Sequence, residues 1–190
     1  MKKIAFLAIA ASAAIATPAM AAVPADQNVT GTITLTGNVA KKCYVGSDNT
    51  ATTFTASHDF GELAATDGTL RSNLDTEFAS DAAMNFTVKC NTGNPTVTIS
   101  RTPMTTIASP ATGYTNTISY NGIVTIDTVS GSVTFDTDAA TPPLATGPLG
   151  GAISATGPNV HVKANTFSAS GILVAGAYKG QISIAIAPTV

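Results

Sequence analysis

The sequence predicts an all-β protein, and three observations lead to that prediction. Threonine occurs 31 times among the 190 residues, and this β-branched residue fits the half-buried surface of a pleated sheet. Short runs with a two-residue apolar alternation recur along the chain, as in strands whose side chains point to opposite faces. No segment after the first 21 residues keeps a 3.6-residue apolar rhythm for more than two turns, so no long amphipathic helix is expected.

Residues 1–21 have the three parts of a secretory signal peptide. Lys2-Lys3 supplies the positive charge, residues 4–16 form a short apolar stretch, and Ala19-Met20-Ala21 is a small-x-small cleavage site. The apolar stretch is shorter than the roughly 20 residues that a membrane-spanning helix needs. We therefore expect an exported protein whose mature chain starts directly after this leader.

Residues 28–39 alternate almost perfectly between two kinds of side chain. Four threonines fall on one face, and the other face carries Val29, Gly31, Ile33, Leu35, Gly37 and Val39. This pattern predicts a β-strand with one apolar face. Two interpretations stay open: the strand is the first strand of a closed sandwich, or it leaves its own domain and pairs in a neighbouring molecule.

Three segments in the first half of the chain are expected to form strands: residues 51–60, 84–90 and 96–101. The second of them presents one apolar face, made by Met84, Phe86, Val88 and Cys90. The turn-forming residues Gly93-Asn94-Pro95 separate the second strand from the third.

In residues 117–126 the dipeptide Asn121-Gly122 divides two short apolar runs. Because Asn-Gly tolerates the positive φ of a type I′ turn, we expect a tight hairpin here. Short strands are also expected at 132–135 and 159–163. Residues 139–158 hold four of the ten prolines and four glycines, which predicts a surface loop.

The last expected strand covers residues 177–186. Its apolar face consists of Tyr178, Gly180, Ile182, Ile184 and Ile186. No strand is expected after it. Because an unpaired apolar edge is an aggregation hazard, we expect another segment to cover this face.

Cys43 and Cys90 are the two cysteines of the chain. An even pair in an exported protein is expected to form a disulfide. A two-cysteine metal site is the alternative, but it needs further ligands, and neither His58 nor His161 has metal-ligand spacing to a cysteine. No metal and no cofactor are therefore expected.

The composition argues against several classes of function. Charged residues make up 11% of the chain, the formal net charge is −2, and no basic patch occurs, so no nucleic-acid partner is expected. No Gly-x-Ser-x-Gly elbow or phosphate-binding glycine loop is present. Asp127, Asp136 and Asp138 do not follow the spacing of a calcium loop and are interpreted as solvated loop acids. Both histidines are interpreted as surface or groove residues, and we expect no catalytic site and no enzyme.

Several short motifs occur in an order that resembles a known family. The signal peptide and the alternating segment are followed by Cys43, Asp59-Phe60-Gly61-Glu62-Leu63, Val88-Lys89-Cys90, Ile118-Ser119-Tyr120 and a terminal Ala175-Gly176-Ala177-Tyr178 stretch. This order resembles the spore-coat-U-like subunits of archaic chaperone–usher pili. The terminal strand is also similar to that of class 5 fimbrial major subunits.

The resemblance implies an incomplete immunoglobulin-like β-sandwich that is completed by a donor strand. Residues 22–40 would form an N-terminal extension and residues 41–190 the pilin domain. The donor strand would present Val29, Gly31, Ile33, Leu35 and Val39. The acceptor groove would be lined by Tyr178, Ile182, Ile184 and Ile186, and the disulfide would join the first two strands of the core.

These implications lead to the hypothesis of a structural subunit of a surface pilus that supports adhesion and biofilm formation. The expected partners are neighbouring copies or other pilus subunits, a periplasmic chaperone and an outer-membrane usher, and the expected location is the cell surface. The alternative is a self-contained secreted β-sandwich that binds carbohydrate or matrix. That alternative requires residues 28–39 to pair within their own chain.

Overall fold

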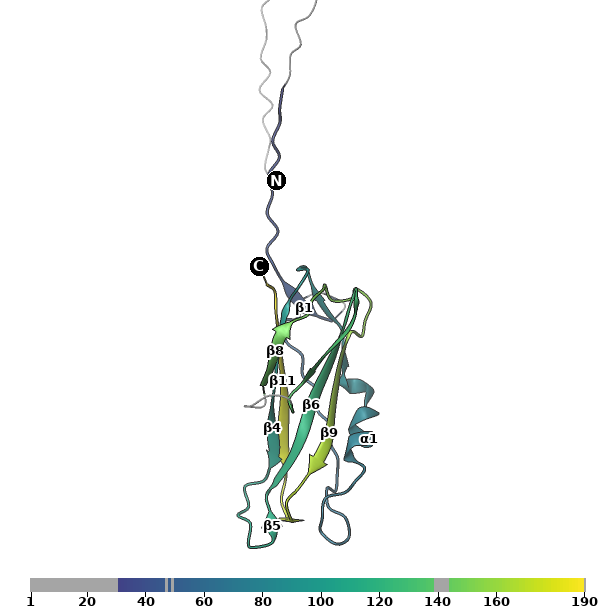
Figure 1. The fold of residues 1–190 in the computed structure, drawn as a ribbon, viewed down its shortest axis with the longest axis vertical. Helices are drawn as coiled ribbons and strands as arrows, with labels where there is room; N and C mark the ends of the chain where they lie inside the picture. Colours follow the sequence, from purple (N-terminus) through teal and green to yellow (C-terminus); the bar gives the residue numbers. More distant parts are fainter. Residues whose placement is uncertain (1–30, 47, 49, 139–143, 190) are drawn as a thin grey trace, which may run out of the picture. The chain divides into compact units, whose positions relative to one another are not determined.

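The computed structural model describes residues 31–46, 48, 50–138 and 144–189 of the chain (Figure 1). Its contacts divide the chain into two units, Met1–Asn38 and Val39–Val190. The expected signal peptide and the first residues of the predicted strand at 28–39, Val29 included, lie outside the described residues. No helix among the described residues is both long enough and apolar enough to cross a membrane.

The second unit contains the helices and strands that the described residues form, and most of them are strands. Its helical elements are α1 (Leu74–Ala79) and the 3-10 turn η1 (Ala82–Met84). Its strands are β1 (Cys43–Val45), β2 (Asn85–Phe86), β3 (Val88–Cys90), β4 (Thr96–Thr105), β5 (Tyr114–Thr115), β6 (Thr117–Thr128), β7 (Gly131–Asp136), β8 (Leu144–Pro148), β9 (Val160–Ser168), β10 (Ile172–Leu173) and β11 (Lys179–Ala187). The prediction of an all-β fold is confirmed.

The main sheet has seven strands and is divided into two halves. In one half β4 lies between β11 and β8; in the other, β6 lies between β7 and β9, and β2 pairs with β9. The halves are joined where Met104 and Thr105 of β4 pair with Ile118 and Thr117 of β6. From this corner β4 and β6 diverge towards the end of the domain at which β1 lies (Figure 1).

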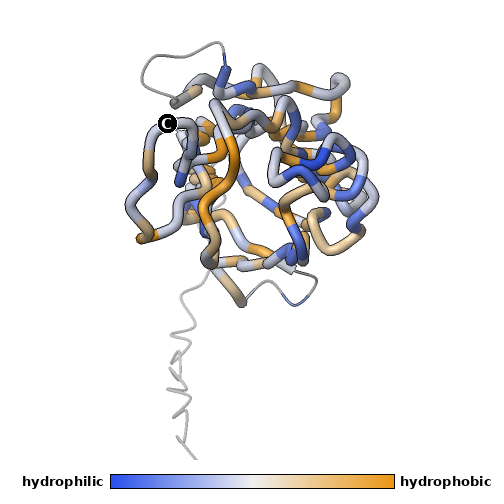
Figure 2. Tube along the Cα trace, turned by 90° about the horizontal axis from the view of Figure 1, so that it is seen from below, coloured by the Kyte–Doolittle hydropathy of each residue, from blue (hydrophilic) through white to orange (hydrophobic). Residues whose placement is uncertain are grey.

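The two halves enclose an apolar core made by alternate residues of the long strands. The side chains that are almost completely buried include Val88, Val97, Ile99, Ile118, Val124, Ile126 and Val160. Threonines between them point to the outer faces, where Thr98 bonds to Thr146 and Thr125 bonds to Thr134 across neighbouring strands. Along the trace, hydrophobic and hydrophilic positions accordingly follow each other closely (Figure 2).

Cys43 and Cys90 form the predicted disulfide, with their Cα atoms 4.1 Å apart. The two residues lie directly opposite each other in the antiparallel pair of β1 and β3. The predicted strand at 84–90 is interrupted at Thr87, because β2 pairs with β9 whereas β3 pairs with β1. The metal-site alternative for the cysteines is therefore wrong.

The strands predicted at 96–101, 132–135, 159–163 and 177–186 correspond to β4, β7, the start of β9, and β11. The short helix α1 was not expected. At six residues it is too short to produce a recognisable rhythm, although its buried Leu74 and Phe78 lie one turn apart and the helix contacts β9.

The predicted hairpin at Asn121-Gly122 is wrong, because β6 runs through both residues. They pair with Asn165 and Ala164 of β9, and Gly122 has no positive φ. A Cβ atom at Gly122 would lie 3.3 Å from Cγ1 of Ile182, so packing explains the glycine. The Asn121 side chain is buried, and its oxygen accepts a hydrogen bond from the Thr137 hydroxyl. Its polar group is therefore satisfied inside the domain and does not form a turn.

Two further predictions are corrected. Residues 52–62 form no strand, and only Ala51 makes an isolated bridge, to Val45. The loop predicted at 139–158 contains β8, which pairs with residues 96–100 of β4. In this second case the pairing partner, which is distant in sequence, overrides a local composition that is rich in proline and glycine.

The fully buried side chain of Asn159 joins β3 to the segment that precedes β9. Its Oδ1 accepts a hydrogen bond from Val88 N at 2.8 Å, and its Nδ2 donates to the carbonyl oxygens of Val88 at 2.8 Å and Ser154 at 2.7 Å. The side-chain amide therefore pairs with a strand residue as a neighbouring backbone would, and it satisfies two buried backbone groups of Val88 and the partly buried carbonyl of Ser154.

Replacing Asn159 by leucine is expected to lower the free energy of unfolding by roughly 3 kcal/mol, because two buried backbone groups of Val88 and the partly buried carbonyl of Ser154 lose their partners at once. Denaturant unfolding followed by far-UV circular dichroism measures the effect. Asn85→Leu is the matched control, since Asn85 is exposed and should change stability by less than about 1 kcal/mol. Equal losses in both variants would contradict this account of Asn159.

Candidate functional site

Strand β11 is an edge strand whose apolar face lacks cover. It pairs with β4 along its full length, with Ile184 opposite Ile99 and Ile186 opposite Val97, and no described strand pairs with its other edge. Residues opposite each other in an antiparallel pair share a face. The two β4 side chains are completely buried, whereas the two isoleucines of β11 are only partly buried.

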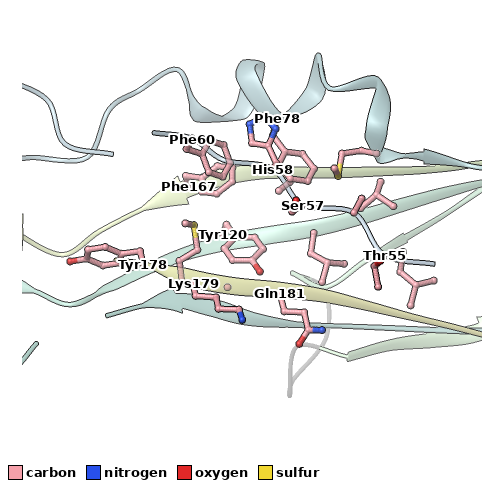
Figure 3. A pocket seen from close by; sticks show the side chains of 18 of the residues that line it. Thr55, Ser57, His58, Phe60, Phe78, Tyr120, Phe167, Tyr178, Lys179 and Gln181 are labelled. Atoms are coloured by element: carbon pink, nitrogen blue, oxygen red, sulfur yellow. The ribbon is translucent and has the colours of Figure 1, made fainter. Parts of the chain in front are cut away.

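Two adjoining cavities lie along this uncovered face, with volumes of about 490 and 750 Å3. Both are lined by Phe54 and Ile184, so they meet at these two residues. The first reaches Tyr178, the residue before β11, and the second reaches Pro188 beyond its end. We call the two adjoining cavities together the β11 groove; they extend along the strand, and Figure 3 shows the first of them.

The wall opposite β11 consists of residues 52–62, called here the 52–62 wall. Among the described residues it makes no backbone–backbone hydrogen bonds. Aromatic contacts hold it instead: the ring of Phe54 lies 4.3 Å from that of Phe86, and the ring of Phe60 lies 5.3 Å from that of Phe167. This wall is therefore held to the rest of the domain mainly by its side chains.

Phenylalanine is concentrated in the β11 groove. Of the seven phenylalanines in the chain, five line the first cavity: Phe54, Phe60, Phe78, Phe86 and Phe167. They come from the 52–62 wall, α1, β2 and β9, and Figure 3 shows Phe60, Phe78 and Phe167 close together. Sequence reasoning missed this cluster because its members are far apart in the chain and only the fold brings them together.

Phe167 reaches the groove from an irregular point of β9. Thr166 has a φ of 53°, a strained conformation for a β-branched residue. The carboxylate of Asp75 in α1 accepts hydrogen bonds from the backbone N–H groups of Thr166 and Phe167, at 3.1 and 3.4 Å. The ring of Phe167 then stacks on Tyr120 at 5.4 Å. Asp75 thus stabilises the backbone that directs an aromatic side chain into the groove.

The predicted acceptor residues of β11 line the β11 groove. Tyr178, Ile182 and Ile184 line the first cavity, and Ile184 and Ile186 line the second. The hydroxyl of Tyr178 donates to the carbonyl oxygens of Thr115 and Val174, each at 3.0 Å, and burial raises its pKa. These bonds anchor the start of β11 to the loops at that end of the domain.

Gly180 lies between Tyr178 and Ile182 on the same face of β11. A Cβ atom at this position would lie 2.7 Å from Cγ of Met104 and 3.1 Å from the ring of Tyr120. Only glycine allows β11 to approach the floor of the groove this closely.

The predicted donor residues that the structure describes are exposed. The side chains of Ile33, Leu35 and Val39 are 88%, 92% and 82% exposed, and residues 31–42 form no helix or strand. Gly31 has open space where a Cβ would be, and Val29 lies outside the described residues. Their role as donors remains a prediction.

The two histidines lie in different parts of the fold. His58 belongs to the 52–62 wall and lines the first cavity. His161, on β9, lies 2.7 Å from Asn85 Oδ1 and 3.2 Å from Asp127 Oδ2. Hydrogen bonds from the Ser132 hydroxyl and from His161 lower the pKa of Asp127. Over the described ranges, no three metal-ligating side chains gather at a point that could hold an ion.

Comparison with known proteins adds no family assignment. A scan against protein-family models and searches of the curated proteins and of the solved structures give no match. The geometry of the β11 groove and the sequence are therefore the basis for a functional proposal.

Tyr120, on the floor of the groove, should resist ionisation. Burial raises its pKa to about 12, and its hydroxyl donates to Thr102 O at 2.8 Å. Because an unfolded tyrosine has a pKa of about 10, the neutral phenol stabilises the fold up to that pH, and this contribution is lost as the pH rises through about 12.

A spectrophotometric titration of tyrosinate absorbance measures this step. Tyr120→Phe should reduce the absorbance change near pH 12 by one tyrosine, and Tyr114→Phe, at a half-exposed position, should leave it unreduced. An undiminished change in Tyr120→Phe would mean that the placement of Tyr120 in the groove floor is wrong.

Proposed function

We propose that this chain is a structural subunit of a surface pilus and that its copies are joined by exchange of a donor strand. In this proposal residues 28–39 of one copy fill the β11 groove of the next. The observation that carries the proposal is the uncovered apolar face of β11, a strand that pairs on one edge only among the described residues. The exposed alternating segment supplies a matching strand within the same sequence.

The energetic case rests on hydrogen bonds and apolar burial. A strand added at the free edge of β11 would satisfy its unpaired backbone groups, while alternate side chains would enter the groove. Ile33 and Leu35 are 88% and 92% exposed in the single chain. Burying either side chain is worth roughly 1.5–3 kcal/mol. A donated strand would therefore remove two exposed apolar surfaces together, one on the donor and one on the acceptor.

The chemistry of the two surfaces is complementary. Phenylalanine, isoleucine and methionine make up the apolar part of the β11 groove lining, which suits the apolar face of residues 28–39. The threonines of that segment would remain on the solvent face. Gly31 and Gly37 share the apolar face and allow close approach where the groove is shallow.

This kind of contact leads to a filament. The donor segment and the acceptor groove are different surfaces of one chain, so the contact is heterologous and need not close into a ring. Each copy would donate one strand and receive one. A chaperone that occupies the groove before assembly, an usher, and roles in adhesion and biofilm formation are included in the proposal on the strength of the family resemblance.

The double variant Ile33→Asp/Leu35→Asp tests the donor role. Replacing the two apolar side chains removes roughly 3–6 kcal/mol of apolar burial, so the yield of polymer should fall at least roughly a hundredfold. The measurement is the ladder of assembled species on a denaturing gel, with and without boiling, after expression with the assembly machinery of the host.

Thr32→Asp/Thr34→Asp is the matched control, because it adds the same two charges on the opposite face of the same segment. It should assemble normally. A normal ladder from the Ile33/Leu35 variant would exclude donor exchange through these residues. Equal loss of polymer in both variants would show that assembly does not depend on which face of the strand carries the charges.

A further inference from the structure

His58 occupies an unusual position in the 52–62 wall, between two carboxylates. Its Nδ1 lies 2.8 Å from Oδ2 of Asp81, and its Nε2 lies 4.0 Å from Oε1 of Glu77. The side chain is 13% exposed, and Nε2 is buried with no hydrogen-bond partner among the described residues. The rings of Phe60 and Phe78 pack edge-on against it at 4.5 and 5.3 Å.

The protonation state of this ring decides how many bonds it makes. A neutral imidazole has one N–H, so either tautomer donates to one carboxylate and presents a lone pair to the other. An imidazolium has two N–H groups and can donate to both Asp81 and Glu77. Such charge-assisted hydrogen bonds are stronger than neutral ones, and imidazole is the side chain whose charge ordinarily changes between pH 5 and 8.

The other charged side chains of the wall and of α1 already make ion pairs or hydrogen bonds. Arg71 Nη2 lies 3.1 Å from Glu77 Oε2 and 2.9 Å from Phe60 O, so the arginine also holds the wall to α1. On the wall, Asp59 accepts a hydrogen bond from Gly61 N, and Glu62 accepts one from Ala64 N. On α1, Asp75 binds the backbone of β9.

Two more ionisable groups face the same space. Across the cavity, Lys179 of β11 is the cationic lining residue and Tyr120 the phenolic one (Figure 3). The hydrogen bond from His58, followed by one from Ala83 N, lowers the pKa of Asp81, which keeps this carboxylate charged through mildly acidic conditions.

A bond from His58 has direct consequences for the groove. Among the described residues, the 52–62 wall has no backbone–backbone hydrogen bonds, and its side-chain contacts to α1 and to the loop before η1 run through His58, Phe60 and the arginine on Phe60 O. A second charge-assisted bond from His58 would therefore tighten the wall that faces β11.

We propose that His58 is a proton-operated latch of the β11 groove, which fastens the 52–62 wall to Asp81 and Glu77 in mildly acidic surroundings and loosens it in alkaline ones. The motion of the wall is a property of the domain alone. The consequence for assembly rests on the proposed function: a donor strand held behind a fastened wall should leave the groove more slowly at pH 5.5 than at pH 8.

The wall is tested first, in the mature chain carrying Ile33→Asp/Leu35→Asp, which cannot donate a strand. NMR order parameters of the backbone amides of residues 52–62 should rise when the pH is lowered from 8 to 5.5. His58→Gln should abolish this response. His161→Gln is the matched control, since it removes the other of the two histidines in the chain and should leave the response intact.

A second variant guards against a loss of folding in His58→Gln. Asp81→Asn removes one carboxylate of the latch while keeping an acceptor for Ala83 N, and it should weaken the pH response of the wall. An identical response in the parent, His58→Gln and Asp81→Asn chains would overturn the latch, as would order parameters that do not change with pH in the parent.

Assembled polymer is tested next, by the rate at which subunits are released on heating. Release should be roughly threefold to tenfold slower at pH 5.5 than at pH 8, the change expected from one gained charge-assisted bond that is partly screened. His58→Gln should remove this difference. If the order parameters of the wall change with pH but no polymer forms, the latch is supported and the proposed function is wrong. If polymer forms and the rate of subunit release depends neither on pH nor on His58, the latch is wrong.

Discussion

The one-sided pairing of β11 is the constraint on which the rest of the structure depends. From Gln181 to Ala187 the strand pairs with β4 without a break, and this pairing places Ile184 and Ile186 on the same face as the buried Ile99 and Val97. A β-sandwich normally covers such a face with a further strand. Here the described residues leave a groove, and the other features of the site follow its course.

The two sides of the β11 groove are held in different ways. On one side β11 is held by its backbone pairing with β4, and Gly180 and Tyr178 fix its depth and its starting point. On the other side the 52–62 wall is held by rings, by an arginine and by His58. Under the proposed function, the wall without backbone pairing is the side that we expect to adjust when a strand enters the groove.

The sequence predicted those parts of the fold that depend on local pattern. Alternation located β4, β7, β9 and β11, and the cysteine pair located the disulfide. It failed where distant partners decide: Asn121-Gly122 is a turn signal by itself but lies in the middle of β6, with Gly122 packed on Ile182. The same holds for the site, since alternation indicated the face of β11, whereas the opposing wall and its phenylalanines are assembled only by the fold.

The most direct test of the central claim is a solid-state NMR measurement on polymer made from two differently labelled batches of the chain. One batch carries 13C and the other 15N, so that any 13C–15N contact joins two molecules. The account predicts intermolecular contacts between Ile33 or Leu35 of one copy and residues 182–186 of another. If contacts between these residues appear only within one uniformly labelled copy, the strand pairs within its own molecule. Exchange of a donor strand between copies would then be wrong.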